Sequence, residues 1–230
     1  MNDVESKSTT DLGSFLVSNT APIGKLYGDL RQYQTKAILS AAIISGLEIE
    51  QPPTEFGITK KSPEFIRKVP LGRIPSFEDN EGFKLTEGVA IARYVSSLVP
   101  EAGLLGHNTK ETAQIDQWIH FAEAEIVIPA NNIYVGITFK YLPGFNEKQR
   151  KYYQERVELS LKFLEDYLTP HIILAVCLRR AGQSVCGAKE REHVYPHTFA
   201  YFAKVNSNAR IKHVFGESDF VDEPLTFKAE

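Results

Sequence analysis

The feature that most constrains the fold is a proline, Pro75, inside a strand-like run at residues 73–78 (RIPSFE). Proline has no backbone N–H, so within a sheet it is confined to an edge or to a special turn. A polar turn at residues 79–82 (DNEG) and a second strand-like run at 83–86 (FKLT) follow directly. The pattern predicts a strand, a tight hairpin and a second strand, with Pro75 near the start of the first.

Helical and strand-like segments alternate on either side of this hairpin. Residues 25–27 (KLY) are a short strand candidate, and the apolar spacing then predicts a helix with Thr35 as its N-cap. Residues 47–50 (LEIE) alternate apolar and acidic side chains, which is typical of a half-buried strand. Pro63 begins a second helix and Glu87 opens a third. The predicted order is strand, helix, strand, helix, strand, strand, helix.

The character of the sequence changes after residue 100, where two apolar stripes with helical spacing follow a linker. The first stripe contains Ile115, Trp118, Ile119, Ala122 and Ile126, and the second contains Val157, Leu161, Leu164 and Leu168. We therefore predict a small α/β domain followed by an all-α domain. The expected divisions are a flexible N-terminal arm at 1–22, the α/β domain at 23–99, a linker at 100–109 and the helical domain at 110–230.

The composition is that of an ordinary soluble globular protein. Of the 230 residues, 43% are hydrophobic and 24% are charged, and the net charge is −3. No basic stripe is present, so the charge gives no reason to expect a nucleic-acid partner. The apolar stretches are too short to span a bilayer and the first residues lack the features of a secretory signal, so we expect a cytoplasmic protein with no membrane partner. The two cysteines, Cys177 and Cys186, imply no disulfide framework and no metal site.

Glu87 and Gly88 bring together groups that can bind the amino-acid end of a ligand. Free backbone N–H groups at a helix start can receive a carboxylate, while the Glu87 carboxylate can accept a hydrogen bond from an α-ammonium. The alternative is that Glu87 only stabilises the helix as an acid in its first turn. Because Glu87 follows the Ile74–Pro75 pair and the end of a strand, we favour the binding role.

The segments around these residues resemble a known family. In order and spacing they are similar to the glutathione-transferase-like domain of translation elongation factor 1B gamma, at residues 56–65 (FGITKKSPEF), 69–78 (VPLGRIPSFE), 82–87 (GFKLTE) and 114–118 (QIDQW). The resemblance runs from about residue 25 to residue 216. It implies a thioredoxin-like N-terminal domain, an all-α C-terminal domain, glutathione as the bound cofactor, and a homodimer.

The resemblance also assigns roles near Pro75. In this fold the peptide bond before the proline is cis, and the Ile74 backbone pairs with the cysteinyl part of glutathione as if with an added strand. Arg73 stands at the family's lysine position, where its guanidinium pairs with the glycyl carboxylate; the alternative is a solvated charge at the strand edge. Gly88 stands where the family usually has serine. The backbone amide remains, but a hydroxyl for the γ-glutamyl carboxylate is lost, which predicts modestly weaker binding.

The catalytic position also departs from the family. Residues 26–36 (LYGDLRQYQTK) align without gaps with the start of theta-type transferases, which places Gln32 at the catalytic serine. A thiol with a pKa near 8.5 is mostly protonated at neutral pH, so catalysis needs a group that stabilises the thiolate. Gln32 can donate from its side-chain amide and Arg31 can supply positive charge. Tyr33 or Thr35 can supply a hydroxyl at the helix N-terminus. The alternative is a site that binds glutathione without activating it.

Two features of the helical domain concern a second substrate. Trp118, Phe121 and Tyr134 on the first long helix can line a pocket for a hydrophobic electrophile, although apolar stripes more often form core. Residues 167–170 (YLTP) run directly into 171–175 (HIILA), about a dozen residues short of the family's usual stretch and without the acid of its capping box. This shortening either opens space near the substrate pocket or is a neutral loss of loop.

Two functions fit these residues. The first is an enzyme that adds the glutathione thiol to an electrophilic small molecule such as a conjugated olefin, where reversible addition gives net trans–cis isomerisation. The second is a non-catalytic scaffold of the translation elongation factor 1B complex. That subunit continues through a lysine-rich linker into a further domain, whereas this sequence has a short polar tail after Phe220, so we expect the enzyme. The chain resembles fungal glutathione transferases of secondary metabolism, including an olefin isomerase of a polyketide–peptide pathway.

Overall fold

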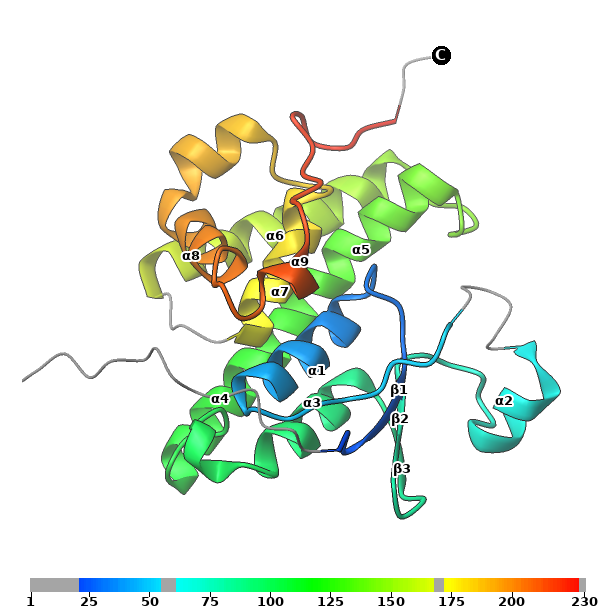
Figure 1. Ribbon diagram of the computed structural model, residues 1–230. Coiled ribbons are helices and arrows are strands. Elements are labelled where there is room, and N and C mark those ends of the chain that lie inside the picture. Colours follow the sequence, from blue (N-terminus) through cyan, green and yellow to red (C-terminus); the bar gives the residue numbers. More distant parts are fainter. Residues whose placement is uncertain (1–20, 55–60, 168–171, 228–230) are drawn as a thin grey trace, which may run out of the picture.

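The structure, a computed structural model, describes residues 21–54, 61–167 and 172–227 (Figure 1). Residues 1–20 of the predicted arm lie outside the described residues, as do residues 56–60 of the resembling segment. The shortened junction at 168–171, with Leu168 of the second stripe, also lies outside them. The described chain forms a small sheet domain followed by a helical domain, which is the predicted arrangement.

The N-terminal domain is built on a three-stranded antiparallel sheet, in the order β1 (Gly24–Tyr27), β2 (Ser76–Asp79) and β3 (Lys84–Thr86). Leu26 pairs with Phe77 across the first two strands, and both side chains are almost fully buried. Side chains at paired positions lie on the same face of a sheet, so these two anchor the core of this domain.

The hairpin between β2 and β3 is as predicted. The Asp79 carboxylate accepts hydrogen bonds from the backbone N–H groups of Glu81 and Phe83, at 2.9 and 2.8 Å. Gly82 has a φ of 87°, a left-handed conformation that glycine adopts without steric cost. The turn is therefore closed by one side chain and permitted by one glycine.

The strand predicted at residues 47–50 forms a single parallel bridge rather than a regular strand. The bridge joins Lys25 to Glu50, and the Ile23 N–H donates to the Glu48 carbonyl at 2.9 Å. The segment thus lies along the outer side of β1. The alternation of the sequence predicted its half-burial, and its pairing with β1 consists of this one bridge and the hydrogen bonds around it.

Two helices, α1 (Tyr33–Ile44) and α3 (Gly88–Ser97), pack on one face of the sheet, and α2 (Pro63–Lys68) lies on its other side (Figure 1). The start of α2 at its proline is as predicted. The predicted N-cap of α1 was wrong: Gln32 takes that position, and Thr35 is already buried in the first turn.

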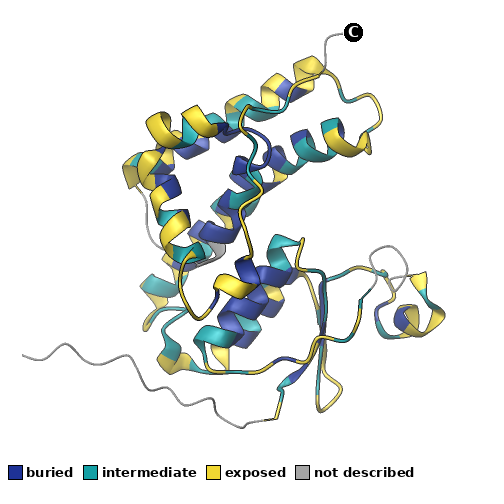
Figure 2. Cartoon of the chain, turned by 45° about the horizontal axis from the view of Figure 1, so that its top comes forward, coloured by how far each residue is buried: buried dark blue, intermediate teal, exposed yellow. Residues whose placement is uncertain are grey.

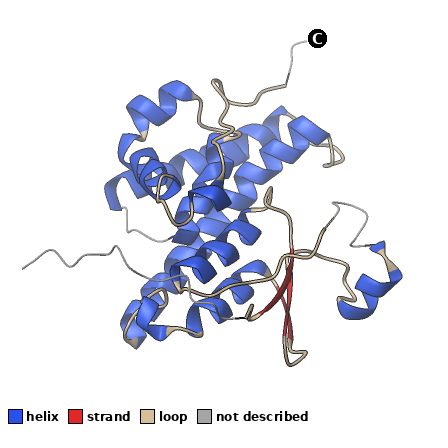
Figure 3. Cartoon of the chain, in the orientation of Figure 1, coloured by secondary structure: helices blue, strands red, loops and turns tan. Residues whose placement is uncertain are grey.

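Beyond the short turn η2 (Pro100–Ala102), every regular element of the described chain is a helix, and loops join the helices (Figure 3). Its elements are α4 (Thr109–Phe121), η3 (Ala122–Val127), α5 (Ile128–Tyr134), η4 (Val135–Phe139), α6 (Glu147–Tyr167), α7 (Ile172–Gly182), η5 (Glu190–Val194), α8 (Pro196–Asn206) and α9 (Lys212–Phe215). Across the described ranges, no helix has both the length and the apolar character needed to cross a membrane.

The first four of these elements form one continuous helical run that contains Pro129. Proline cannot donate to the carbonyl four residues before it, and its ring crowds that carbonyl. η3, directly before the proline, is a wider π-type turn, which lets the helix continue past this position. The wide turn also carries Glu123, which takes part in the site described below.

Both predicted stripes form the core of the helical domain, as far as the structure describes them. Every residue of the first stripe is buried, and so are Val157, Leu161 and Leu164 of the second. Apart from Ile115 and Ile119, they share one buried cluster with residues of α7, and Figure 2 shows buried positions in the middle of this domain. Cys177 and Cys186 belong to the same core as free thiols, and burial raises the pKa of each well above its usual value.

Helix α1 joins the two domains. The buried Lys36 ammonium donates to the carbonyls of Val214 and Phe215, at 2.8 and 2.6 Å, at the end of α9. Arg179 of α7 also donates to the Phe215 carbonyl, at 3.0 Å. The position of the N-terminal end of α1 is therefore fixed from the sheet on one side and from the helical domain on the other.

Candidate functional site

Gln32 links the start of α1 to the segment before β2. Its side chain makes no capping hydrogen bond to the helix; instead its Nε2 donates to the Ile74 carbonyl at 3.0 Å. Its Oε1 accepts weaker contacts, both 3.4 Å long, from the Asp29 N–H and the Thr35 hydroxyl. The predicted catalytic residue and the predicted cysteinyl-binding residue are therefore direct neighbours.

The Ile74 backbone is available to a ligand on its N–H side. The Ile74–Pro75 peptide bond is cis, and the Ser76 hydroxyl holds the turn by donating to the Arg73 carbonyl at 2.7 Å. Within residues 21–54, 61–167 and 172–227, no group accepts a hydrogen bond from the Ile74 N–H. A backbone N–H beside a strand, with no partner in the described chain, is a donor that an extended ligand can use.

Glu87 has an unusual backbone conformation at the start of α3. Its φ is 66°, which is uncommon for a residue with a side chain and costs about 1–3 kcal/mol. The Glu87 side chain is exposed and makes no capping hydrogen bond, and no other described side chain accepts from the first N–H groups of α3. Strained residues of this kind cluster at ligand-binding sites.

Gly88, the first residue of α3, lies directly against the first turn of α1. A Cβ at position 88 would lie 2.3 Å from the Gln34 Cβ and 3.4 Å from the Pro75 Cγ. The N-termini of α1 and α3 therefore meet in van der Waals contact beside the proline turn. The predicted binding residues Ile74, Pro75, Glu87 and Gly88 are brought together here, with Gln32 attached to them through Ile74.

The two predicted arginines lie at the edge of this region and are exposed. Arg31 forms a two-pronged ion pair with Asp29 in the loop before α1, and the Arg31 hydrogen bonds hold the Asp29 pKa below its usual value. Arg73 forms no ion pair with any described residue. Its position beside Ile74 fits either the ligand contact or the solvated charge.

Tyr33 faces the helical domain. Its hydroxyl donates to the Glu123 carboxylate at 2.8 Å, and burial raises its pKa far above the usual value. Nearby, the guanidinium of Arg180 lies 4.1 Å from the centre of the Tyr134 ring. These side chains form a polar cluster between the domains. Sequence reasoning missed Glu123 and Arg180 as site residues, because neither lies in a motif.

Trp118 and Phe121 belong mainly to the packing between α4 and α6. Trp118 is buried, its ring stacks on Phe163 with centroids 5.9 Å apart, and Phe121 contacts the edge of the same pair at 5.6 and 5.5 Å. The proposed role in a second-substrate pocket remains a prediction. Tyr134, from the same predicted set, lies at the polar cluster with Arg180 instead.

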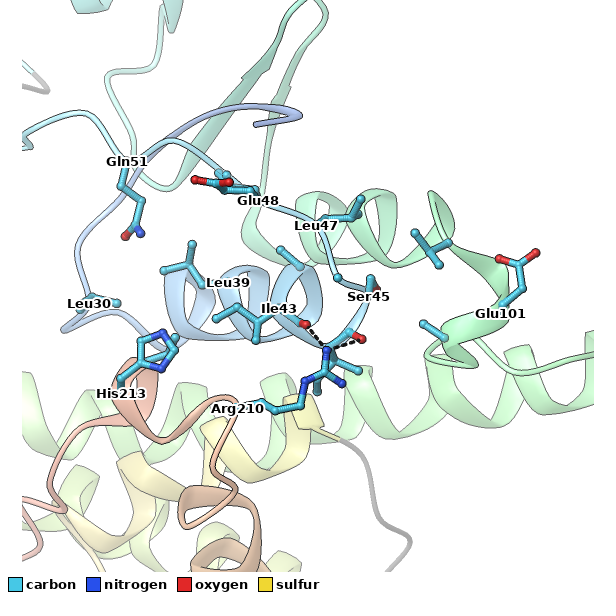
Figure 4. Close-up of a pocket in the computed structure, with 17 residues that line it drawn as sticks. Leu30, Leu39, Ile43, Ser45, Leu47, Glu48, Gln51, Glu101, Arg210 and His213 are labelled. Carbon is cyan, nitrogen blue, oxygen red and sulfur yellow. Dashed lines mark hydrogen bonds between the residues drawn. The ribbon is translucent and has the colours of Figure 1, made fainter. Parts of the chain in front are cut away.

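A groove of about 1040 Å³ runs along another side of α1, and none of the predicted glutathione-site residues lines it (Figure 4). Leu39 and Ile43 of α1 form its floor, Leu47 lies on one wall, and Arg210 and His213 lie on the other. Arg210 is occupied in part by the carbonyls at the end of α1, to which it donates. The groove is thus separate from the candidate glutathione site, where the N-termini of α1 and α3 meet.

Comparison with known proteins gives the family. Residues 22–97 match the family described as Glutathione S-transferase, N-terminal domain. The chain is 32% identical to the glutathione S-transferase-like protein FUS3 of Gibberella moniliformis, over 87% of this chain and 96% of that protein. It is 31% identical to the glutathione S-transferase-like protein LUC7 of a Fusarium species, over 88% and 97%. Human elongation factor 1-gamma is 30% identical over 90% of this chain, which spans about half (49%) of that protein.

Solved structures agree on the fold. The glutathione-transferase-like domain of elongation factor 1-gamma from Saccharomyces cerevisiae matches 91% of this chain and all of that chain with a TM-score of 0.75, at 23% identity. The glutathione transferase URE2P6 from Phanerochaete chrysosporium, solved with oxidised glutathione, matches 84% and 95% with a TM-score of 0.72, at 19% identity. The thioredoxin-like domain followed by an all-α domain is therefore confirmed, and the chain belongs to the glutathione transferase superfamily.

Proposed function

We propose that this protein binds glutathione where the N-termini of α1 and α3 meet, and adds its thiol to an electrophilic small molecule. The observation that carries the proposal is the strained Glu87 backbone at an uncapped helix N-terminus, in contact with a second helix N-terminus through Gly88. Helix N-termini favour anions, and glutathione carries two carboxylates and a thiol that reacts as an anion.

The residues of the site match the parts of glutathione one by one. The first amides of α3 would bind the γ-glutamyl carboxylate, and Glu87 would accept from the α-ammonium. The Ile74 N–H and carbonyl would pair with the cysteinyl backbone, since the N–H has no partner in the described chain. Arg73 would pair with the glycyl carboxylate.

Activation of the thiol falls to Gln32 and the N-terminus of α1. One N–H of the Gln32 amide is used on the Ile74 carbonyl, which leaves the second N–H to donate to a thiolate. Arg31 is neutralised in part by Asp29, and the Tyr33 hydroxyl is used on Glu123, so both contribute less to this step. Stabilising the thiolate lowers the pKa of the thiol toward neutral pH.

The proposed reaction is addition to a conjugated olefin. The thiolate forms a bond to the β-carbon, and the electron pair of the double bond moves to the conjugated group, where a proton is taken up. If the adduct keeps this proton, the product is a conjugate. If the proton and the thiolate leave after rotation about the new single bond, the olefin returns as the other isomer and glutathione is regenerated. We place this activity in fungal secondary metabolism because the sequence resembles fungal glutathione transferases of that kind, and because fungal glutathione S-transferase-like proteins match it over nearly their whole length.

We also propose a cytoplasmic homodimer. Large apolar side chains are exposed along α6 at Tyr152, Leu159, Phe163 and Tyr167, and exposed apolar patches mark interaction surfaces. The second candidate function, a scaffold in the elongation factor 1B complex, is favoured by the identity to human elongation factor 1-gamma. Turnover of glutathione by the isolated protein separates the two candidates, because a scaffold has no need of it.

The proposal is tested by calorimetric titration with reduced glutathione. Glu87→Gln should weaken binding at least tenfold, because it removes the charge that faces the α-ammonium. Glu81→Gln, at the exposed turn of the same domain, is the matched control and should leave the affinity unchanged. A wild-type protein that does not bind glutathione at millimolar concentration would contradict the proposal.

A further inference from the structure

Gly88 is required by its surroundings and not by its backbone. Its φ lies outside the left-handed region, so any residue could adopt this conformation. The space for a side chain, however, is already taken by Gln34, whose Cβ and Cγ would lie 2.3 and 2.5 Å from a Cβ at position 88. A Cβ essentially never lies within 3.0 Å of another carbon outside its own residue and chain neighbours, so Gln34 as placed here and a serine at position 88 exclude each other.

The polar end of Gln34 is available. The side chain is half-buried, and its amide makes no hydrogen bond with any residue that the structure describes. Beyond Cγ only two bonds remain, about 1.5 and 1.3 Å long, so the amide lies within about 5 Å of the missing Cβ. Gln34 thus brings a donor and an acceptor to the space beside the first turn of α3.

We propose that Gln34 binds the γ-glutamyl end of glutathione in place of the hydroxyl that a serine at position 88 would supply. This inference rests on the proposed function of the same site. Its Nε2 donates to the α-carboxylate, next to the backbone amide of Gly88, while Glu87 receives the α-ammonium. Gly88 and Gln34 are then a matched pair: the glycine makes room for the glutamine, and the glutamine restores the lost donor.

The role predicts a specificity for the α-carboxylate. A glutathione analogue in which 4-aminobutyrate replaces the γ-glutamyl residue keeps the rest of the molecule but lacks that carboxylate. The Gln34 amide therefore has no carboxylate to bind in this analogue. A contribution from packing of the Gln34 side-chain carbons would instead be the same for both ligands.

The test measures dissociation constants for glutathione and for this analogue by calorimetry. Gln34→Ala should weaken glutathione binding about 10-fold or more, as expected for a hydrogen bond to a charged group, and change analogue binding less than about 2-fold. Gln117→Ala, an exposed glutamine on α4, is the control and should change neither. Gly88→Ser should weaken glutathione binding, because its Cβ would lie 2.3 Å from the Gln34 Cβ.

The outcomes separate this inference from the proposed function. If wild type binds glutathione but Gln34→Ala binds it equally well, Gln34 has no role and the inference fails while the function stands. Equal losses for glutathione and the analogue would also overturn the inference, because they show an effect of packing alone. If wild type binds no glutathione, the proposed function itself fails. Gln34→Ala removes atoms and creates no clash, so this result does not depend on whether Gly88→Ser folds.

Discussion

At the scale of single residues, Glu87 is held in a conformation that glycine would adopt more easily. The structure tolerates the strain of its left-handed backbone at the start of α3, where the carboxylate faces solvent. A strained backbone with an exposed carboxylate is expected of a residue that binds a ligand and does not stabilise the fold.

Glu87→Gly should therefore raise the free energy of unfolding by about 1 kcal/mol and weaken glutathione binding at least tenfold. Lys140 offers the control, because it is the other non-glycine residue with a positive φ (53°) among the residues described. Lys140→Gly should stabilise the protein without affecting glutathione. Urea unfolding and calorimetry measure the two quantities. A Glu87→Gly variant that is less stable, or that binds glutathione as well as wild type, would argue against strain kept for function.

Tyr33 separates activation of the thiol from packing between the domains. Its hydroxyl is used on Glu123, so Tyr33→Phe should keep kcat/KM for thiol addition within about 2-fold of wild type. Stability should fall by about 1–3 kcal/mol, because the Glu123 carboxylate loses its donor. Gln32→Ala is the comparison and should lower kcat. A loss of kcat in Tyr33→Phe with unchanged stability would instead make Tyr33 the activating residue.

Sequence spacing predicted Ile74, Pro75, Glu87 and Gly88 as neighbours because they lie on consecutive elements of one hairpin and helix. It did not predict Gln34, whose contact with Gly88 depends on how α1 packs against α3. Contacts of this kind join segments far apart in the chain. Which residues meet depends on the tertiary packing of the helices and not on the local hydrophobic pattern.

At the scale of elements, the hydrophobic periodicity predicted the helices and the hairpin well. It did not predict where a strand lacks regular backbone pairing or at which residue a helix begins. Residues 47–50 have the alternation of a strand but form one bridge at the outer side of β1. Threonine is a common N-cap residue, yet α1 begins before Thr35, which is buried in the first turn of the helix. The wide turn before Pro129 leaves no clear periodic signal.

The attachment of α1 to α9 should depend on pH through Lys36. Burial lowers the pKa of its ammonium to about 8, with the nearby Arg179 charge acting in the same direction. Between about pH 8 and the usual value of 10.5, the unfolded chain binds a proton that the folded chain does not, so stability rises with pH in this window. The unfolding free energy of wild type relative to Lys36→Met should increase across it. Parallel curves for the two proteins would show that Lys36 is not perturbed.

At the scale of the whole molecule, the order of elements predicted a small α/β domain followed by helices, because a strand–helix–strand unit followed by a hairpin and a helix leaves few arrangements. The family came from the resemblance of the motifs between residues 56 and 118. The position of the helical domain against α1 could not be predicted. It depends on single contacts such as Lys36 with the Val214 carbonyl and Tyr33 with Glu123.

The most direct test of the account is a crystal structure of the protein soaked with glutathione. The account predicts the γ-glutamyl group at the N-terminus of α3, the cysteinyl backbone paired with Ile74, and the sulfur within hydrogen-bond reach of the Gln32 amide or the first N–H groups of α1. Glutathione bound only in the groove of Figure 4, or a sulfur beyond reach of all these donors, would contradict it.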